Sequence, residues 1–555
     1  MAVPTPSEVT YLNRLGSVHL GTNNAPRSSS LLLPPSLSPR DSLPYSNTSK
    51  QPPRRPSLWL TKRYFNILAV FALFLSVLFL LSFLIPSTKL RPWKNAYLSS
   101  GKYLGVYNPE DQESAAQDHT LDFYAEYYDD PLNPPLYSDY HQRELQLPQH
   151  NLSLPFPEGR HGKYFWVGNH ARSSGWGNVM QELLLIHYLT YRSGRTLVFD
   201  NYTWNEDGSD YSDYNGKLIP SRIPLTALIQ GPTVGAPYIT EAGLPRSVKK
   251  EFWDQVCPSP VTMMNEDLRD KIEGGLSAKK MVDKWAEVLT ATDEPCIQIP
   301  RHSWSIFDIY TFGDPNLLLD VWPEFSKSPI LTEFGWSPLV ERAFDVNRLV
   351  FAPFNRKAPY LTGAPFTTSA ERYAPLPGLL ALHIRRGDFK QHCHDLAEWR
   401  SSYTGYNSFP DLPDKFVVPT DPTTEARLPL YLQNCYPTIR EIVQRVQEVR
   451  ATPAGRGLMY IYIMTNGDTA WVDQLKRALR ATGVWANIAS SRDLVVNHEE
   501  RYVKHAVDML IGQRAQVFVG NGFSSMSGLI VMLRMANGLS ADSNRFWQTV
   551  TETIG

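Results

Sequence analysis

The stretch Leu379–Phe389, LLALHIRRGDF, decides the fold of this chain. Its first residues are apolar, as in a strand that is buried on both faces of a parallel sheet. His383, Arg385, Arg386 and Asp388 then follow at the point where the strand would end. In open α/β sheets, ligands bind beyond the carboxyl ends of the strands, so two guanidinium groups there indicate a site for a phosphate or a carboxylate. A strand that ends in a solvated turn is the alternative interpretation.

Strands and helices are predicted to alternate on both sides of this stretch. Before it, the candidate strands Tyr164–Val167 and Thr196–Phe199 flank an apolar helix that ends at Gly194. After it, the candidate strands Leu458–Met464 and Ala515–Val519 are separated by helices with one apolar face. This alternation predicts an α/β fold with two Rossmann-like parallel sheets.

Two further elements at strand ends are suited to binding an anion. Gly175, Gly177 and Asn178 open the first helix, where glycine lets the backbone approach a ligand and the helix N-terminus offers free N–H groups. Ser524 and Ser525 begin a helix after the last long strand and can hold a phosphate in the same way. A purely conformational turn and simple helix capping are the alternatives. With the arginine pair, these elements indicate a diphosphate site between two domains.

Length and composition leave room for two globular domains and a membrane anchor. The chain has 555 residues, of which 42% are hydrophobic, and a net charge of -1. It contains no run of five or more Lys and Arg residues, which argues against a nucleic-acid-binding protein. Tyr64–Ile85 has no charged residue and would span about 33 Å as a helix, close to the hydrocarbon thickness of a membrane. Because about 60 residues precede it, we expect a retained anchor and no cleaved signal peptide.

The predicted organisation has five parts. They are a disordered cytosolic tail at 1–63, a transmembrane helix at 64–85, a stem at 86–159, an acceptor-side Rossmann-like domain at 160–365 and a second Rossmann-like domain at 366–555. Positive charges flank both ends of the apolar span, so charge leaves its orientation undecided.

Cysteines and glycosylation sequons favour a lumenal body. All four cysteines follow the span, namely Cys257, Cys296, Cys393 and Cys435. The sequons at Asn151 and Asn201 follow it as well. An even number of cysteines is expected in an oxidising compartment. Neighbouring pairs would each close a loop of about 40 residues, although four cysteines permit three pairings. We therefore expect a type II membrane glycoprotein of the Golgi or endoplasmic reticulum.

Three motifs resemble those of a known family. GWGN, HIRRGDF and VDMLIGQRAQVFVGNGFSSMSG are similar, in this order, to motifs of the GDP-fucose protein O-fucosyltransferases and their α1,6-fucosyltransferase relatives. The resemblance covers roughly residues 160 to 540, and RRGDFKQHC with YLQNCYP resembles the fungal membrane-anchored members. It implies a GT-B fold, an inverting transfer of fucose from GDP-fucose, no cofactor and no obligatory metal. The chain also lacks the Asp-x-Asp pattern with which transferases of the other major fold hold a cation.

The resemblance also implies roles for single residues. Arg385 should contact the β-phosphate, and His383 should lie against the nucleotide. Asp508 resembles the acid that hydrogen-bonds the guanosine. The phosphate-holding stretch corresponds to Ser524, Ser525 and Met526. Methionine replaces the usual aromatic residue there, which leaves a stacking role open.

The general base is not assigned by these motifs. Some relatives have a glutamate where this chain has Gly175. Glu182, Asp388 and an oxygen of the departing phosphate are the candidates. Arg386 is expected to point away from the site and to form a surface or interdomain salt bridge.

The sequence therefore predicts a fucosyltransferase that moves fucose from GDP-fucose to a protein or glycan acceptor. A transferase for another GDP-sugar is one alternative. A nucleotide-sugar-binding membrane protein without turnover is the other, because of Gly175 and Met526. Neither the acceptor nor the linkage can be inferred from the motifs.

Overall fold

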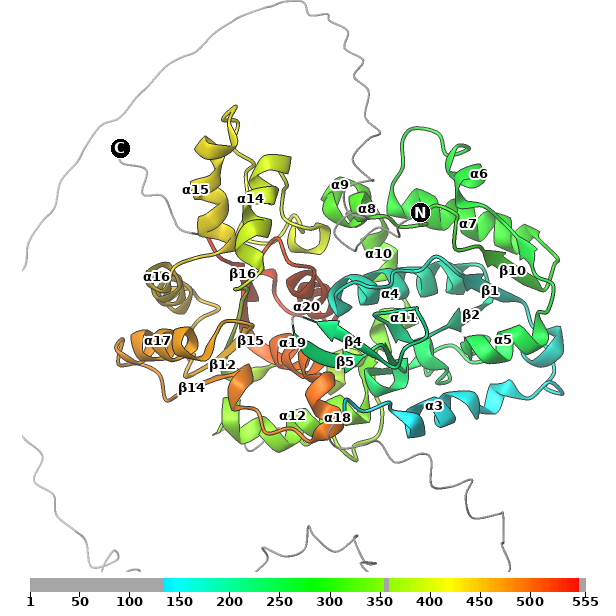
Figure 1. The fold of residues 1–555 in the computed structure, drawn as a ribbon, viewed down its shortest axis with the longest axis horizontal. Helices are drawn as coiled ribbons and strands as arrows, with labels where there is room; N and C mark the ends of the chain where they lie inside the picture. Colours follow the sequence, from blue (N-terminus) through cyan, green and yellow to red (C-terminus); the bar gives the residue numbers. More distant parts are fainter. Residues whose placement is uncertain (1–132, 215, 354–358, 549–555) are drawn as a thin grey trace, which may run out of the picture. The chain divides into compact units, whose positions relative to one another are not determined.

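Two parallel sheets, each of five strands, form the framework of the protein (Figure 1). The structure is a computed structural model and describes residues 133–214, 216–353 and 359–548. The first sheet has the order β8-β2-β1-β10-β9 and the second the order β14-β13-β12-β15-β16, and all their strand pairs are parallel. The predicted α/β fold with parallel sheets is confirmed.

The strands of the sheets have these bounds: β1 (Tyr164–Val167), β2 (Thr196–Phe199), β8 (Val248–Lys249), β9 (Val261–Thr262) and β10 (Cys296–Ile299) in the first, and β12 (Leu376–Ile384), β13 (Tyr460–Thr465), β14 (Asn487–Ser490), β15 (Ala515–Gly520) and β16 (Asn544–Phe546) in the second. The longer helices are α4 (Trp176–Arg192), α5 (Lys250–Val256), α7 (Ala278–Ala291), α12 (Pro338–Phe351), α14 (Phe389–Trp399), α15 (Thr424–Cys435), α16 (Ile439–Ala451), α17 (Thr469–Arg480), α19 (Lys504–Arg514) and α20 (Ser525–Ala536). Shorter elements include α3 (Ser138–Leu145), α8 (Ile309–Gly313), α18 (His498–Tyr502), β3 (Tyr202–Thr203), β4 (Tyr211–Tyr214), β5 (Lys217–Pro220) and β6 (Arg222–Ile223).

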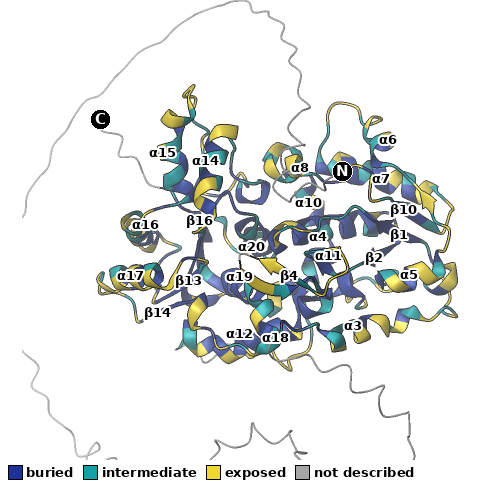
Figure 2. Ribbon diagram, in the orientation of Figure 1, coloured by how far each residue is buried: buried dark blue, intermediate teal, exposed yellow. Residues whose placement is uncertain are grey.

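Strand β12 is the centre of the second sheet and explains the apolar run from which the fold was predicted. Leu380, Leu382 and Ile384 pack into one hydrophobic cluster, whereas Leu379 and Ala381 pack into another. Alternate side chains of a strand point to opposite faces, so both faces of this strand are covered. Figure 2 shows strands such as β1, β2 and β13 in the buried colour and exposed segments on helices such as α17.

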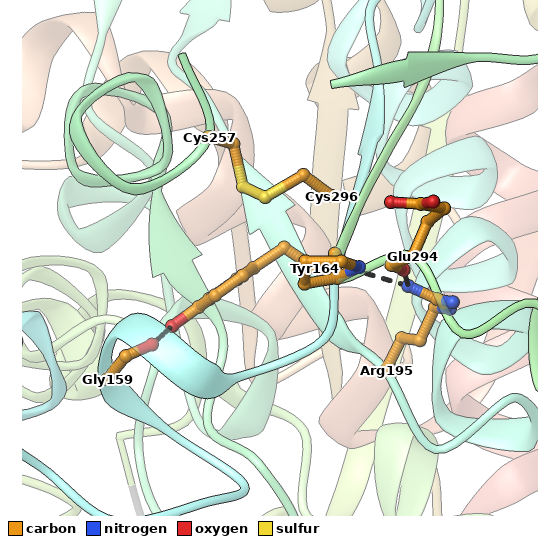
Figure 3. The surroundings of a disulfide bond; sticks show 7 residues. Gly159, Tyr164, Arg195, Cys257, Glu294 and Cys296 are labelled. Atoms are coloured by element: carbon orange, nitrogen blue, oxygen red, sulfur yellow. Dashed lines mark hydrogen bonds between the residues drawn. A yellow bond between two sulfur atoms is a disulfide. The ribbon is translucent and has the colours of Figure 1, made fainter. Parts of the chain in front are cut away.

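Both disulfides join neighbouring cysteines. Cys257 at the end of α5 pairs with Cys296 at the start of β10, with a Cα–Cα distance of 5.6 Å, and Figure 3 shows this bond beside Tyr164 of β1. Cys393 of α14 pairs with Cys435 of α15, with a Cα–Cα distance of 5.9 Å. The predicted disulfides are confirmed. Of the three pairings that the sequence left open, the structure has the one that joins neighbouring cysteines. The second bond fixes two helices that flank the end of β12.

The predicted membrane span at 64–85 lies outside the described residues. Within 133–214, 216–353 and 359–548, no helix is both long and apolar enough to cross a membrane.

The two predicted glycosylation sites differ in accessibility. Asn151 is exposed, and its side-chain oxygen accepts a hydrogen bond from the Ser153 N–H at 3.0 Å. Asn201 is half-buried, and its side-chain oxygen accepts a hydrogen bond from the Lys249 ammonium at 2.7 Å. Glycosylation stays a prediction, and the structure favours Asn151 as its site.

The C-terminal part of the predicted stem is folded onto the body. Tyr137 is buried, and its hydroxyl donates to the Glu499 carbonyl at 2.8 Å. Glu144 of α3 pairs with Lys249 at 2.7 Å, and neither side chain is more than 1% exposed. The same carboxylate accepts hydrogen bonds from the N–H and hydroxyl of Thr226, each at 2.9 Å. Hydrogen bonds and an ion pair therefore join this segment to Glu499, Lys249 and Thr226 of the body.

The buried pair between Glu144 and Lys249 gives a prediction for stability. Glu144→Gln leaves the buried Lys249 charge with only the more distant Asp200 carboxylate, at 4.0 Å, which should lower the free energy of unfolding by about 2–4 kcal/mol. The matched control is Asp254→Asn, since the Lys250–Asp254 pair lies on the surface of α5 and should contribute less than about 1 kcal/mol. Midpoints of urea unfolding measure both. Equal shifts for the two variants would show that α3 is not needed for the stability of the body.

Candidate functional site

The first turns of α4 and α20 lie against each other (Figure 1). A Cβ on Gly177 would lie 2.8 Å from the backbone N of Met526 and 2.8 Å from the carbonyl carbon of Ser525. The Gln181 side-chain N–H donates to the carbonyls of Gly177 at 2.8 Å and Ser525 at 2.9 Å. Only glycine fits at position 177, because real Cβ atoms essentially never approach other atoms so closely. The glycine motif is therefore needed for packing between two helix starts.

A cavity of about 550 Å³ opens at this contact. The predicted site residues that line it are Gly175, Gly177, Asn178, Arg385, Ser524, Ser525 and Met526. All three predicted anion-binding elements therefore meet at one cavity, as the sequence indicated. The first N–H groups of a helix have no partner within the helix, and they lie at its positive end. Two such ends and one guanidinium group make this part of the cavity suited to a diphosphate.

Arg385 reaches the cavity from the end of β12. Its guanidinium lies 4.6 Å from the centre of the Phe389 ring and donates to the Asp388 carboxylate at 3.2 Å. Its Nε is buried and has no hydrogen-bond partner in the described part of the chain. An arginine held on a ring, with an N–H free for a further acceptor, is arranged for a planar contact with phosphate oxygens.

Arg386 points to the opposite side, as predicted, but its surroundings differ from the expected salt bridge. The side chain is only 6% exposed and lies between the rings of Tyr436 at 4.2 Å and Trp471 at 4.1 Å. It also donates to the Pro437 carbonyl. The expectation of a surface or interdomain ion pair is wrong because this guanidinium is buried among aromatic rings of the second domain.

Ser524 is the N-cap residue of α20, yet its side chain makes no capping hydrogen bond. It is buried at the cavity wall, and Ser525 beside it is half-buried. The structure therefore does not support the alternative interpretation, in which the Ser524 side chain caps the helix. Both hydroxyl groups lie where an anion would meet the helix N-terminus.

His383 and Asp508 lie behind the wall of the cavity. The His383 ring is buried, its Nδ1 shares a hydrogen bond with the Ser527 hydroxyl at 2.8 Å, and burial lowers its pKa to about 3. The Asp508 carboxylate accepts hydrogen bonds from Tyr462 at 2.5 Å and Ser491 at 2.9 Å, and burial raises its pKa to about 6. Neither side chain lines the cavity, so their roles toward a nucleotide stay predictions.

The two carboxylates predicted as candidate bases also lie outside the cavity lining. Asp388 is exposed at the start of α14 and pairs with Arg385. Glu182 is a buried residue of α4, where its carboxylate accepts a hydrogen bond from the Ala171 N–H at 2.5 Å and burial raises its pKa to about 7. It lines a separate cavity of about 30 Å³ beside His170. No described carboxylate lines the larger cavity.

The sequence did not indicate the aromatic part of the cavity. Its lining includes Trp176, Tyr202, Trp204, Tyr214, Phe389, His392, Tyr502 and His505. Tyr202, Trp204 and Tyr214 come from short strands or a loop, and the other five come from four different helices. No local periodic pattern indicates that residues so far apart in the sequence meet at one site. Among the described residues, no group of three or more His, Cys, Asp or Glu side chains could hold a metal ion.

The model of the GDP-fucose protein O-fucosyltransferase family matches residues 369–537. This range contains the arginine strand, α19 and the start of α20 described above. Over this range, the chain is similar to the GDP-fucose protein O-fucosyltransferases. The resemblance found in the sequence is thereby confirmed, and with it the class of enzyme, a fucosyltransferase.

Solved structures of fucosyltransferases are similar to the chain at low identity. POFUT1 in complex with GDP-fucose is 16% identical, with 70% of this chain and 99% of that chain covered and a TM-score of 0.42. POFUT1 in complex with GDP is 15% identical, with 70% and 99% covered and a TM-score of 0.42. A mutant of Arabidopsis thaliana FUT1 in complex with GDP is 9% identical, with 71% and 73% covered and a TM-score of 0.32. No curated protein matches the chain.

The contact between α4 and α20 can be tested in this fucosyltransferase with two glycines of one motif. Gly177→Ala places a methyl group against the α20 backbone, and such overpacking should lower the free energy of unfolding by about 1–3 kcal/mol. Gly175→Ala meets no atom within 4 Å and should cost less than about 1 kcal/mol. Thermal melting measures both variants. A loss for Gly175→Ala as large as that for Gly177→Ala would contradict the packing role.

The raised pKa of Glu182 predicts a dependence of stability on pH. The folded protein binds this proton more tightly than the unfolded chain, whose carboxyl has the ordinary value of 4.5. The resulting stabilisation is complete below that value and is lost as the pH rises through about 7. Glu182→Gln should therefore gain in Tm relative to wild type between about pH 5 and pH 8.

The control is Glu324→Gln, because partners lower the pKa of this exposed carboxylate and its contribution is lost only as the pH falls. Its Tm difference from wild type should stay constant over the same interval. A constant difference for Glu182→Gln as well would show that this carboxyl is not protonated in the folded protein.

Proposed function

We propose that this fucosyltransferase transfers fucose from GDP-fucose with inversion, without an obligatory metal, on a GT-B fold. The observation that carries the proposal is the meeting of Arg385 with the starts of α4 and α20 at one cavity of about 550 Å³. The two parallel sheets on either side of this cavity correspond to the two Rossmann-like domains of such a fold. The second domain would bind the GDP-sugar and the first would face the acceptor.

The chemistry follows from the charge that develops when the glycosidic bond breaks. The acceptor oxygen bonds to C1 of fucose, the bond from C1 to the β-phosphate oxygen breaks, and the electron pair leaves with GDP. Arg385 and the N–H groups at Gly177 and Ser525 are fixed donors for that growing charge. Preorganised donors of this kind contribute most where charge increases in the transition state.

The proton of the acceptor also needs a destination. Asp388 is paired with Arg385, Glu182 is a buried residue of α4, and neither carboxylate lines the cavity. In an in-line displacement the acceptor attacks the face of C1 opposite to the departing phosphate, so the proton cannot pass directly between them. We infer that a water molecule relays the proton from the acceptor to an oxygen of the departing phosphate, in place of the glutamate that some relatives have at the position of Gly175.

The secretory location is part of the same proposal. Two disulfides join all the cysteines of the chain, as expected in an oxidising compartment. The sequence segment 64–85 would anchor the protein as a type II membrane protein of the Golgi or endoplasmic reticulum.

Thermal shift and product release test the proposal. GDP-fucose should raise the Tm more than GDP-mannose, UDP-sugars or ADP, and GDP should be released from GDP-fucose over time. Stabilisation without release of GDP would indicate a binding protein without turnover. Preferential stabilisation by a uridine nucleotide would overturn the proposal.

Variants of the two arginines test the mechanism. Arg385→Lys should retain part of the GDP affinity and lose most turnover, because lysine offers a point charge in place of a planar fork. Arg385→Ala should lower kcat by about 10²–10³, as for the loss of one oxyanion donor. Arg386→Ala should mainly lower the Tm, since this side chain is buried between Tyr436 and Trp471. Near wild-type kcat in Arg385→Ala, with kcat lost in folded Arg386→Ala, would contradict the assignment.

A further inference from the structure

The cavity has an aromatic wall that the fucosyl-donor chemistry does not use. Its residues all come from one segment of the first domain: Tyr202, Trp204, Tyr214, Ile219, Pro220 and Ile223. None of these side chains carries a charge. The same cavity is lined by Arg385, Ser524 and Ser525, which belong to the second domain. The cavity therefore has an anion-binding part and an apolar part, contributed by different domains.

Hydrogen bonds fix this wall to the loop before α4. The Tyr202 hydroxyl donates to the Ser174 carbonyl at 2.9 Å, and the Ser173 hydroxyl donates to the Trp204 carbonyl at 2.7 Å. The backbone N–H of Trp204 donates to the Ser221 carbonyl at 2.7 Å. The wall is thus held at a set position relative to the helix start where an anion would bind.

Trp204 and Tyr214 are neighbouring rings of this wall. The rings of Trp204 and Tyr214 are 5.1 Å apart and nearly perpendicular, at 89°. Tyr214 is 43% exposed at the end of β4, which Figure 2 shows in the exposed colour. Trp204 is half-buried. Large aromatic side chains usually bury their rings, so an exposed Tyr214 next to Trp204 at a cavity indicates a surface for a ligand.

Two nitrogen atoms at the base of the wall have no hydrogen-bond partner in the described part of the chain. They are Nε1 of Trp176 and Nε2 of His505, and both residues line the cavity. Trp176 is 3% exposed, and its ring lies 5.1 Å from Tyr202 and 6.4 Å from His505. A buried polar group without a partner is costly, so these atoms indicate a ligand with hydroxyl groups.

We propose that this wall is the acceptor subsite and that the acceptor is a sugar. A pyranose ring has an apolar face of C–H groups, which packs on Trp204 and Tyr214, and hydroxyl groups at its edge, which meet Trp176 and His505. A peptide would instead place its backbone N–H and C=O groups against apolar rings, which costs free energy unless they find partners. A sugar hydroxyl oxygen then bonds to C1 of fucose while the bond to the phosphate on the opposite face breaks, and its proton passes through water to an oxygen of the departing phosphate. This inference rests on the proposed function and specifies its acceptor.

The test uses the purified protein, GDP-fucose, an array of glycans with simple p-nitrophenyl glycosides, and a library of peptides containing Ser and Thr. Fucose should be transferred to sugar hydroxyls and not to peptides. Trp204→Ala should raise the KM for the best sugar at least tenfold, an effect much larger than its effect on the Kd for GDP. Trp204→Phe should restore most of the affinity, and Trp176→Phe, which removes the indole N–H together with part of the ring, should raise the KM several-fold.

The matched control is Trp304→Ala, because Trp304 is 57% exposed and does not line the cavity. Its KM for the sugar should equal that of wild type. Three results would overturn the inference. They are transfer to peptides alone, release of GDP with transfer to no acceptor, and an unchanged KM for the sugar in Trp204→Ala. A wild-type protein that neither binds GDP-fucose nor releases GDP from it would instead refute the proposed function.

Discussion

The contact between the starts of α4 and α20 is the constraint on which the site depends. Each helix start carries a partial positive charge, so two of them at close range repel unless an anion lies near both. Gly177 permits the approach, and Gln181 ties the two backbones through two hydrogen bonds. The repulsion that remains is relieved when a diphosphate binds. Packing in the absence of ligand thus prepares the charge distribution that a leaving nucleotide needs.

The adjacent arginines show how one strand end serves two purposes. Arg385 faces the cavity, whereas Arg386 is held between Tyr436 and Trp471 on the other side. Because neighbouring residues of an extended chain point in opposite directions, the buried Arg386 fixes the register that aims Arg385 at the cavity. The disulfide between Cys393 and Cys435 holds α14, and with it the Phe389 ring beneath the Arg385 guanidinium.

Sequence patterns predicted the parts of the structure that depend on local order. The apolar run of β12, the glycines before α4 and the serines before α20 each carry their signal within a few residues. The aromatic wall could not be predicted, since β3 and β6 have only two residues each and their position depends on contacts with Ser173 and Ser174. The burial of Arg386 was also missed, because the aromatic rings around it are distant in sequence.

The division of the cavity between two domains bears on how the reaction could be selective. The second domain supplies Arg385 and the serines, which recognise charge, and charge is the same for every GDP-sugar. The first domain supplies Trp204 and its neighbours, which are apolar and recognise shape. An acceptor that fills the aromatic part excludes water from the anion-binding part, where electrostatic stabilisation is then stronger. Selectivity for the acceptor and acceleration of the transfer would therefore arise from the same event, the closure of the cavity by the correct acceptor.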